Sequence, residues 1–173
     1  TIALVREHLR IPLYVLIRPR SGDFVYSPVE LESMRRDVEA CTRLGCDGIA
    51  IGMLDADGGV DVAGCRSLVA AAGAMGVTFH RAFDCVADRH LALDAVVALG
   101  CERILTSGGA ARAEQGAAAI AADIAHAAGR IALMPGAGLD PANIAAVARA
   151  TGAAEFHASA REFTPGIGRE GPA

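Results

Sequence analysis

The chain has 173 residues, of which 53% are hydrophobic and 21% charged, and its formal net charge is −4. This composition is typical of a globular protein, and neither its acidic balance nor its short apolar runs favour nucleic acid or a membrane as a partner. All 16 basic residues are arginine, which excludes a Schiff-base lysine, a pyridoxal-phosphate anchor and a P-loop lysine.

The first residues show no signal-peptide pattern, and the sequence starts without methionine. We therefore expect the chain to begin inside a longer protein. The cysteines are odd in number and scattered, at Cys41, Cys46, Cys65, Cys85 and Cys101. This spacing favours reduced thiols and a cytoplasmic location over a disulfide framework.

Short apolar or β-branched runs alternate along the chain with segments of helical spacing. Six such runs lie near residues 12–17, 47–53, 76–80, 102–106, 130–134 and 154–158. The first long helix is predicted to begin at Ser27, which forms a capping box with Glu30 around a proline at the first helical position. Asp61, Asp88 and Asp140 are the predicted N-caps of later helices. The alternation predicts βαβ units and a parallel sheet.

The positions of polar residues distinguish a doubly wound open sheet from a β/α barrel. An open sheet concentrates its chemistry at one switch point, whereas a barrel spreads it over the ends of many strands. Nearly every predicted strand here ends in polar residues or glycine, which favours a TIM-type (β/α) barrel in a single domain of residues 1–173. A complete barrel has eight strands and about 250 residues. Six strands therefore predict an incomplete barrel, either a fragment or a chain that covers its sheet edges with a partner, such as a second copy.

The strand-end motifs resemble those of the copper homeostasis protein family CutC. They occur in the family order between residues 12 and 160: Ile17-Arg18-Pro19-Arg20 with Gly22-Asp23-Phe24, Leu54-Asp55-Ala56-Asp57-Gly58, Val77-Thr78-Phe79-His80-Arg81-Ala82-Phe83-Asp84, Ile104-Leu105-Thr106-Ser107-Gly108, Gly136-Ala137-Gly138 and His157-Ala158-Ser159-Ala160. The resemblance implies a cytosolic barrel protein that handles copper as Cu(I). It also implies that two N-terminal βα units, with a Glu-Leu-Cys type motif, and a final helix are missing from this chain.

Two histidines are candidates for acid–base catalysis or metal ligation. Strand parity places His80 on the face opposite Phe79, towards the barrel interior, and places His157 inward on the last run. Inward histidines at the carboxyl ends of barrel strands are typical of functional sites. Asp84 is expected either to orient His80 or to cap the following turn.

Three arginines and several glycine turns predict an anion site at the same rim. Arg18, Arg20 and Arg81 suit carboxylate or phosphate ligands, and the alternative is that they brace the loops. Their bracing partners would be Asp23, Asp55 and Asp84. Backbone amides near the last strands could form the cradle for the anion, with contributions from Ser107, Gly108, Gly136, Gly138 and Ser159.

The residues alone indicate a single candidate metal ligand. Soft Cu(I) prefers thiolate and thioether ligands, and Cys85 is the one cysteine predicted near the rim. Three alternatives therefore remain open. The first is a Cu(I)-binding copper homeostasis protein. The second is a barrel enzyme, such as an isomerase, lyase or hydrolase, that acts on a small anionic or phosphorylated substrate. A scaffold whose rim residues only stabilise loops is the third alternative.

Overall fold

Five parallel strands form one sheet in the computed structural model, which describes residues 1–159. The strands are β1 (Tyr14–Leu16), β2 (Gly48–Ile51), β3 (Gly76–Phe79), β4 (Arg103–Thr106) and β5 (Ala132–Pro135), and they lie across the sheet in this order. Each strand pairs in parallel with the next one in sequence. Within these residues the sheet does not close on itself, and β1 and β5 are its outermost strands. This confirms the predicted α/β fold of an incomplete barrel.

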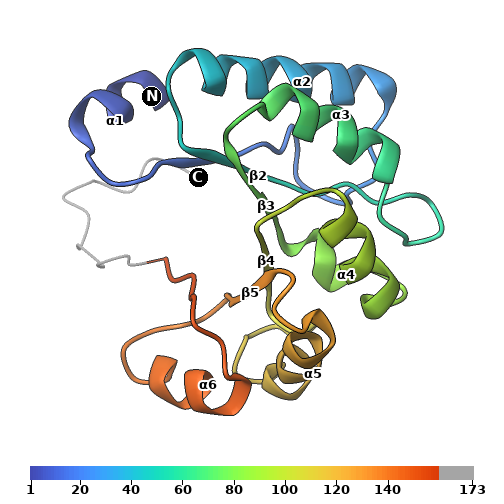
Figure 1. Cartoon of the computed structure of the whole chain (residues 1–173), viewed down its shortest axis with the longest axis vertical. Coiled ribbons are helices and arrows are strands. Elements are labelled where there is room, and N and C mark those ends of the chain that lie inside the picture. The colour runs from blue at the N-terminus through green and yellow to red at the C-terminus, as the bar shows by residue number, and fades with distance from the viewer. Residues whose placement is uncertain (160–173) are drawn as a thin grey trace, which may run out of the picture.

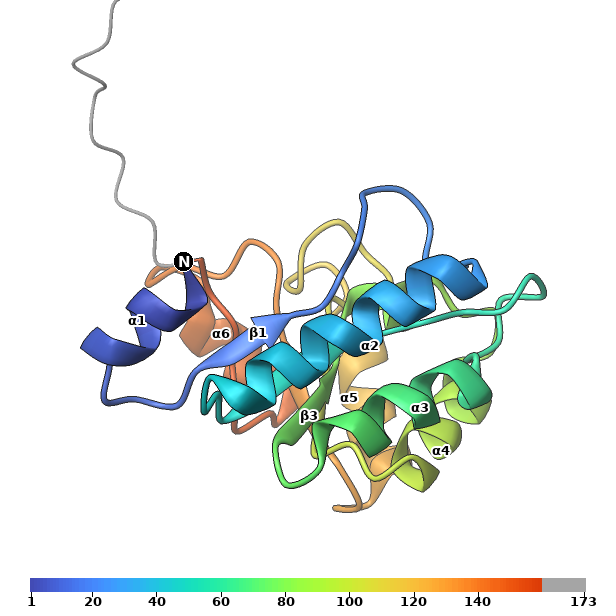
Figure 2. The same ribbon diagram turned by 90° about the horizontal axis from the view of Figure 1, so that it is seen from above.

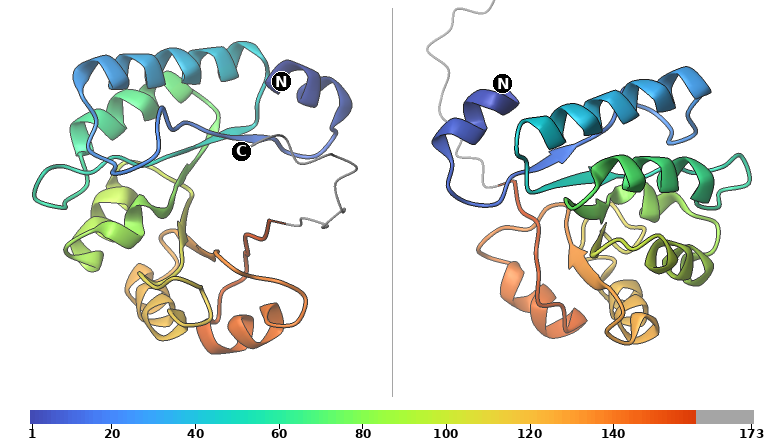
Figure 3. Two further views of the ribbon diagram at one scale, coloured as in Figure 1. Left: turned by 180° about the vertical axis from the view of Figure 1, so that it is seen from behind. Right: turned by 45° about the horizontal axis from the view of Figure 1, so that its top comes forward.

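Helices connect successive strands and cover one face of the sheet. They are α2 (Pro28–Arg43), α3 (Val62–Ala72), α4 (Arg89–Ala98), α5 (Ala117–Ala127) and α6 (Ile144–Thr151), with a short 3₁₀ helix, η1 (Arg81–Cys85), directly after β3. Figure 1 shows α2 to α6 around the outside of the curved sheet, and both views of Figure 3 agree. The N-terminal helix α1 (Ile2–His8) stands apart from this row, beside β1 (Figure 2). None of the helices within residues 1–159 has the length and apolar character that crossing a membrane requires.

The hydrophobic core lies between the sheet and the helices. Ile49 and Ile51 of β2 are completely buried, as are Met34 and Val38 of α2. Alternate strand residues point to the face of the sheet that the helices do not cover. On that face, Leu16 of β1 is 59% exposed. The helix-covered face is therefore the packed one, and the other face is only partly covered by the described residues.

Most predicted helix starts are confirmed. Ser27 and Glu30 form the capping box of α2, while Asp61 and Asp88 cap α3 and α4 through their side chains. The start predicted at Asp140 is wrong: α6 begins at Ile144. The Asp140 carboxylate instead accepts hydrogen bonds from the N–H groups of the two residues before that helix, at 2.9 and 3.1 Å. Such a local turn competes with the helical conformation.

The last predicted run does not form a full strand. Only His157 pairs with the sheet, through an isolated parallel bridge to Gly136. This run lies beside β5 and, among the described residues, has no further strand on its other side to extend the pairing. Ala160, the last residue of the corresponding motif, and the remainder of the predicted domain to residue 173 lie outside the described residues.

Candidate functional site

A small pocket lies where the carboxyl ends of the strands meet, on the face of the sheet opposite the helices. Its volume is about 190 Å³, and it is lined by Leu16, Arg18, Phe24, His80, Arg81 and Leu105. These residues come from β1, β4 and the segments that follow β1 and β3. In a β/α barrel this end of the strands carries the ligand site. The structure therefore brings together three of the predicted residues, Arg18, His80 and Arg81.

The imidazole of His80 is buried and has a defined tautomer. Its side chain is only 4% exposed, and the backbone N–H of Ala82 donates a 3.1 Å hydrogen bond to Nδ1. Since Nδ1 is an acceptor, the proton of the neutral ring lies on Nε2. Nε2 is buried and has no hydrogen-bond partner among the described residues. Burial, followed by the positive charge of Arg18, lowers the pKa of His80 to about 4.

Phe24 and Arg18 form a stack above this histidine. The Phe24 ring lies 5.2 Å from the His80 ring, centroid to centroid, and the guanidinium carbon of Arg18 lies 4.6 Å from the centre of the Phe24 ring. Arg18 also donates a 2.8 Å hydrogen bond to the carbonyl of Gly22. It forms no ion pair with a carboxylate in the described part of the chain. The pocket therefore contains an arginine whose charge is not neutralised by a neighbour.

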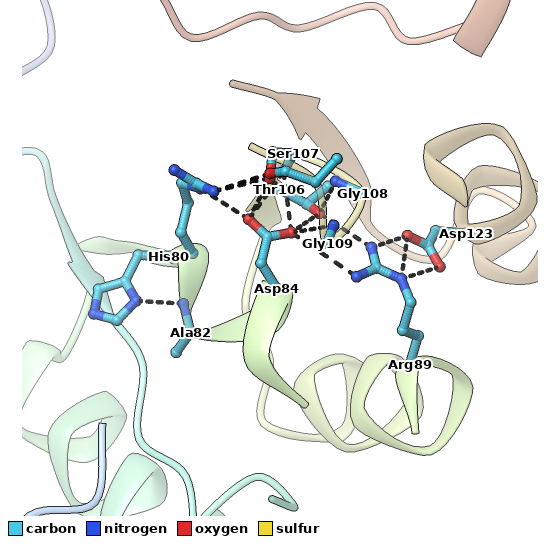
Figure 4. A network of polar contacts seen from close by, with 11 residues as sticks. His80, Ala82, Asp84, Arg89, Thr106, Ser107, Gly108, Gly109 and Asp123 are labelled. Atoms are coloured by element: carbon cyan, nitrogen blue, oxygen red, sulfur yellow. Dashed lines mark hydrogen bonds and ion pairs between the residues drawn. The ribbon is translucent and has the colours of Figure 1, made fainter. Parts of the chain in front are cut away.

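Asp84 organises a polar network beside the pocket (Figure 4). Its carboxylate accepts hydrogen bonds from the Thr106 hydroxyl at 2.6 Å and from the N–H groups of Ser107 and Gly109, each at 3.0 Å. Arg81 Nε donates to the same carboxylate at 2.8 Å. Burial alone would raise the pKa of Asp84, but the Thr106, Arg81 and backbone hydrogen bonds lower it. The carboxylate thus stays ionised and braces the loop after β4. Orienting His80 was one of the two roles expected for Asp84, but this network contains no contact between the two side chains.

An adjoining ion pair was not anticipated from the sequence. Asp123 of α5 is 2% exposed and accepts hydrogen bonds from Arg89 of α4, with Nε at 3.2 and 3.3 Å from its two oxygens. Arg89 Nη2 also donates to Thr106 at 3.1 Å. The available signal was a carboxylate inside the apolar stripe of α5, between the buried residues Ile120 and Ala127. A charge on a buried stripe indicates a paired partner.

The remaining acidic and arginine candidates brace loops. Arg20 binds Glu30 at 2.5 Å and Asp23 at 2.9 Å, and it donates to the carbonyl of Val25 at 2.8 Å. Asp55 accepts hydrogen bonds within its own turn, from the N–H groups of the residues two and four positions later, at 3.0 and 2.7 Å. Of the predicted bracing pairs, the structure therefore contains Arg20–Asp23 and Arg81–Asp84, while Asp55 stabilises a turn.

The glycine candidates lie at close backbone approaches. Gly108 has a φ of +73°, and a Cβ there would lie 2.3 Å from the carbonyl oxygen of Gly116. The carbonyl of Gly138 accepts a 2.8 Å hydrogen bond from Arg112. Gly136 pairs with His157. His157 and Ser159 are both exposed, and neither lines the pocket around His80.

The thiols of the described residues do not gather into a group of three or more potential metal ligands. Cys85, the predicted metal candidate at the rim, is exposed, and the other four cysteines are buried. Within residues 1–159, no group of three or more His, Cys, Asp or Glu side chains is placed to hold a metal ion.

Comparison with known proteins gives consistent matches. The model of the CutC family matches residues 1–162. A "family protein CutC" of Xanthomonas axonopodis pv. citri (strain 306) is 62% identical over 161 residues, which is 93% of this chain and 67% of that protein. A relative of the same name from Bacteroides fragilis is 48% identical over 162 residues, 93% of this chain and 64% of the relative. The chain thus spans about two thirds of the length of these relatives.

Solved structures agree on the fold. The CutC protein of Streptococcus agalactiae, named for copper homeostasis, matches with a TM-score of 0.87 and 31% identity, over 90% of this chain and 78% of that one. An aldolase called QR15 matches with a TM-score of 0.72 over 90% of this chain and 72% of its own, but at 15% identity this likeness shows the fold alone. The fold and its rim pocket define a protein of the β/α-barrel class. Within that class, the chain belongs to the CutC family.

Proposed function

We propose that the rim pocket binds a small anionic ligand and that His80 and Arg18 recognise it. The observation that carries this proposal is the buried Nε2–H of His80, which has no hydrogen-bond partner in the described residues. A buried donor without an acceptor costs about 1–3 kcal/mol. An acceptor oxygen supplied by a ligand would remove this cost, and the nearby guanidinium of Arg18 favours a carboxylate or a phosphate.

The protonation state of His80 restricts its role in this site. Its pKa of about 4 keeps the ring neutral at pH 7, with the proton on Nε2. A neutral imidazole of this tautomer donates a hydrogen bond to a developing or existing negative charge but is a weak base. His80 would therefore act as a donor. Asp84 would act by holding Arg81 and the loop after β4, and His157 would lie at the edge of the site.

The test is a titration of the chain with inorganic phosphate, and separately with sulfate, at constant ionic strength. The imidazole NMR signals of His80 report binding. We expect saturable shifts of these signals, weakened at least tenfold in apparent affinity by Arg18→Gln. Arg36→Gln is the matched control, because Arg36 lies on the outer helix α2 and pairs with Glu32. The absence of saturable shifts, or equal affinities for the Arg18 and Arg36 variants, would contradict the proposal.

A second candidate function is Cu(I) binding as part of copper homeostasis. It is supported by membership of the CutC family, by the copper name of the Streptococcus agalactiae relative, and by the fact that all five cysteines are free thiols. Copper would be the cargo of the protein. Thiolates are the ligands that Cu(I) prefers.

This second function is tested by titrating Cu(I) against a competing chelator under anaerobic conditions. Two proteins are compared: this chain and a longer version extended at its N-terminus to the length of the CutC relatives. Tight binding by either protein supports the copper function, and the comparison shows whether the additional residues contribute ligands. If neither protein competes with the chelator, the result contradicts the copper function, and anion binding at the rim pocket is the one proposed function that remains.

A further inference from the structure

Two cysteines meet at the end of helix α2, on the side of the sheet opposite the rim pocket. The N–H of Cys46 donates a 3.1 Å hydrogen bond to the carbonyl of Cys41, and the N–H of Gly45 donates a bond of the same length to Thr42. Gly45 has a φ of +70°. These features define a Schellman motif, in which the third residue from the helix end packs against the second residue beyond it. Here those two residues are Cys41 and Cys46.

The motif packs these two side chains against each other, and after burial the neighbouring Cys46 thiol also raises the pKa of Cys41. Cys41 is 1% exposed and Cys46 is 7% exposed, just below the surface beside Leu44, which is 37% exposed. Both belong to the hydrophobic core cluster. The backbone motif that ends α2 therefore holds two free thiols together at the amino end of β2.

A pair of thiols restricts which ion can bind. Structural Zn²⁺ sites need four ligands in a tetrahedron, and groups of three or more potential ligands are absent from the described residues. Cu(I) is soft and accepts two thiolates. Two thiolates and one Cu(I) together carry a net charge of −1, smaller than the −2 of the two thiolates without the ion.

We propose that Cys41 and Cys46 form a two-coordinate Cu(I) site. This inference rests on the Cu(I)-binding function proposed above and assigns ligands to it. Each thiol loses its proton to solvent as its sulfur bonds to copper, and the oxidation state of copper does not change. Because Cu(I) must displace these thiol protons, binding strengthens as pH rises.

The test uses the whole chain with Cys85→Ser, which removes the exposed thiol. Cu(I) is titrated against bathocuproine disulfonate under anaerobic conditions, and X-ray absorption counts the sulfur neighbours of copper. We expect one Cu(I) per chain with two sulfur neighbours, and loss of this binding in both Cys41→Ala and Cys46→Ala. Cys101→Ala is the matched control, because Cys101 is 6% exposed and lies before β4, and it should retain binding.

The outcomes separate this inference from the function on which it rests. If the chain binds Cu(I) and either alanine variant keeps the same affinity, the ligand assignment is wrong while the copper function stands. If the chain binds no Cu(I) but the extended version does, the ligand assignment again fails alone. If neither binds, both fail. Should the alanine variants not fold, alkylation of the native chain in mild urea decides: Cu(I) must protect Cys41 and Cys46 more than Cys101.

Discussion

The backbone N–H of Ala82 donates a 3.1 Å hydrogen bond to Nδ1 of His80. This single bond fixes the ring nitrogen that carries the proton, because an acceptor Nδ1 requires a protonated Nε2 in the neutral ring. It also fixes the ring orientation, since the bond spans only two residues at the start of η1. The local turn after β3 therefore determines what His80 can offer a ligand.

The first prediction concerns the titration of His80. Its pKa of about 4 lies below the ordinary value of 6.5 because burial and then Arg18 disfavour the charged ring. NMR of imidazole nitrogens should show the Nε2–H tautomer at pH 7 and a protonation midpoint near pH 4. A midpoint near 6.5, or an Nδ1–H tautomer, would show that the ring is not held as described.

The same pKa predicts how stability depends on pH. Between about pH 6.5 and pH 4 the unfolded chain binds a proton at His80 that the folded chain excludes, so the free energy of unfolding falls as pH is lowered. From the difference between 6.5 and about 4, the loss is about 3 kcal/mol. Urea unfolding at pH 7 and pH 4.5 should show a smaller loss for His80→Gln than for the native chain. His157→Gln, at an exposed position, should behave like the native chain.

A third prediction concerns Gly52, which packs against His80. A Cβ at this position would lie 2.5 Å from Cε1 and Nδ1 of His80 and 2.9 Å from Cβ of Ala82. Overpacking of this kind costs about 1–3 kcal/mol, so Gly52→Ala should lower the urea midpoint. In a His80→Ala background the penalty should shrink, because the ring is gone, without vanishing, because Ala82 remains. Equal penalties in both backgrounds would contradict the packing of the ring on Gly52.

The fold was largely predictable because its signals are local. Caps such as Ser27 and strand parity around His80 depend on neighbours within a few residues; the structure contains the cap and places His80 in the rim pocket. The single bridge at His157 was less predictable, because strand extension depends on neighbouring strands that a local pattern does not specify. The alternation of apolar and polar residues indicates which face of a strand is buried, but not over how many residues the strand pairs with its neighbour.

The site was less predictable because its partners are distant in sequence. Arg81 meets Ser107, 26 residues away, and Arg89 meets Asp123, 34 residues away. The sequence left open whether Arg20 binds a ligand or braces a loop, since both roles use the same guanidinium. The contacts of Arg20 with Glu30 and with loop carbonyls favour bracing. Arg18 differs from Arg20 because it stacks on Phe24 without a carboxylate partner. No sequence pattern distinguishes these two arginines.

A fourth prediction tests the buried ion pair. Asp123 is 2% exposed and binds Arg89 between helices α4 and α5. Removing one member of a buried ion pair costs up to about 3–5 kcal/mol, and Asp84, 3.8 Å from Arg89, compensates part of the remaining charge. Asp123→Ala should therefore lower the free energy of unfolding strongly. Glu32→Ala is the control: it removes a carboxylate that pairs with two arginines on the exposed face of α2, where solvent screens the charges. Similar losses of unfolding free energy in the two variants would contradict the distinction between the buried and the exposed ion pairs.

The last prediction concerns the start of α2, the helix whose other end holds Cys41. The Ser27 side chain accepts a hydrogen bond from the N–H of Glu30, and the Glu30 carboxylate accepts one of 2.7 Å from the N–H of Ser27. Bonds from the backbone of Ser27 and then from Arg20 lower the pKa of Glu30 to about 2. Because Ser27→Ala removes an N-cap, it should cost about 1 kcal/mol in the free energy of unfolding.

The control for this cap is Ser33→Ala, at an exposed position in the same helix. It replaces the same side chain without touching the cap, and alanine favours the helix interior, so stability should be unchanged or slightly higher. The Ser27 variant should also move the NMR midpoint of Glu30 upward, because one of the donors to its carboxylate, the Ser27 hydroxyl, is lost. A loss of stability without any change in the Glu30 midpoint would mean that the capping box does not act as a reciprocal pair.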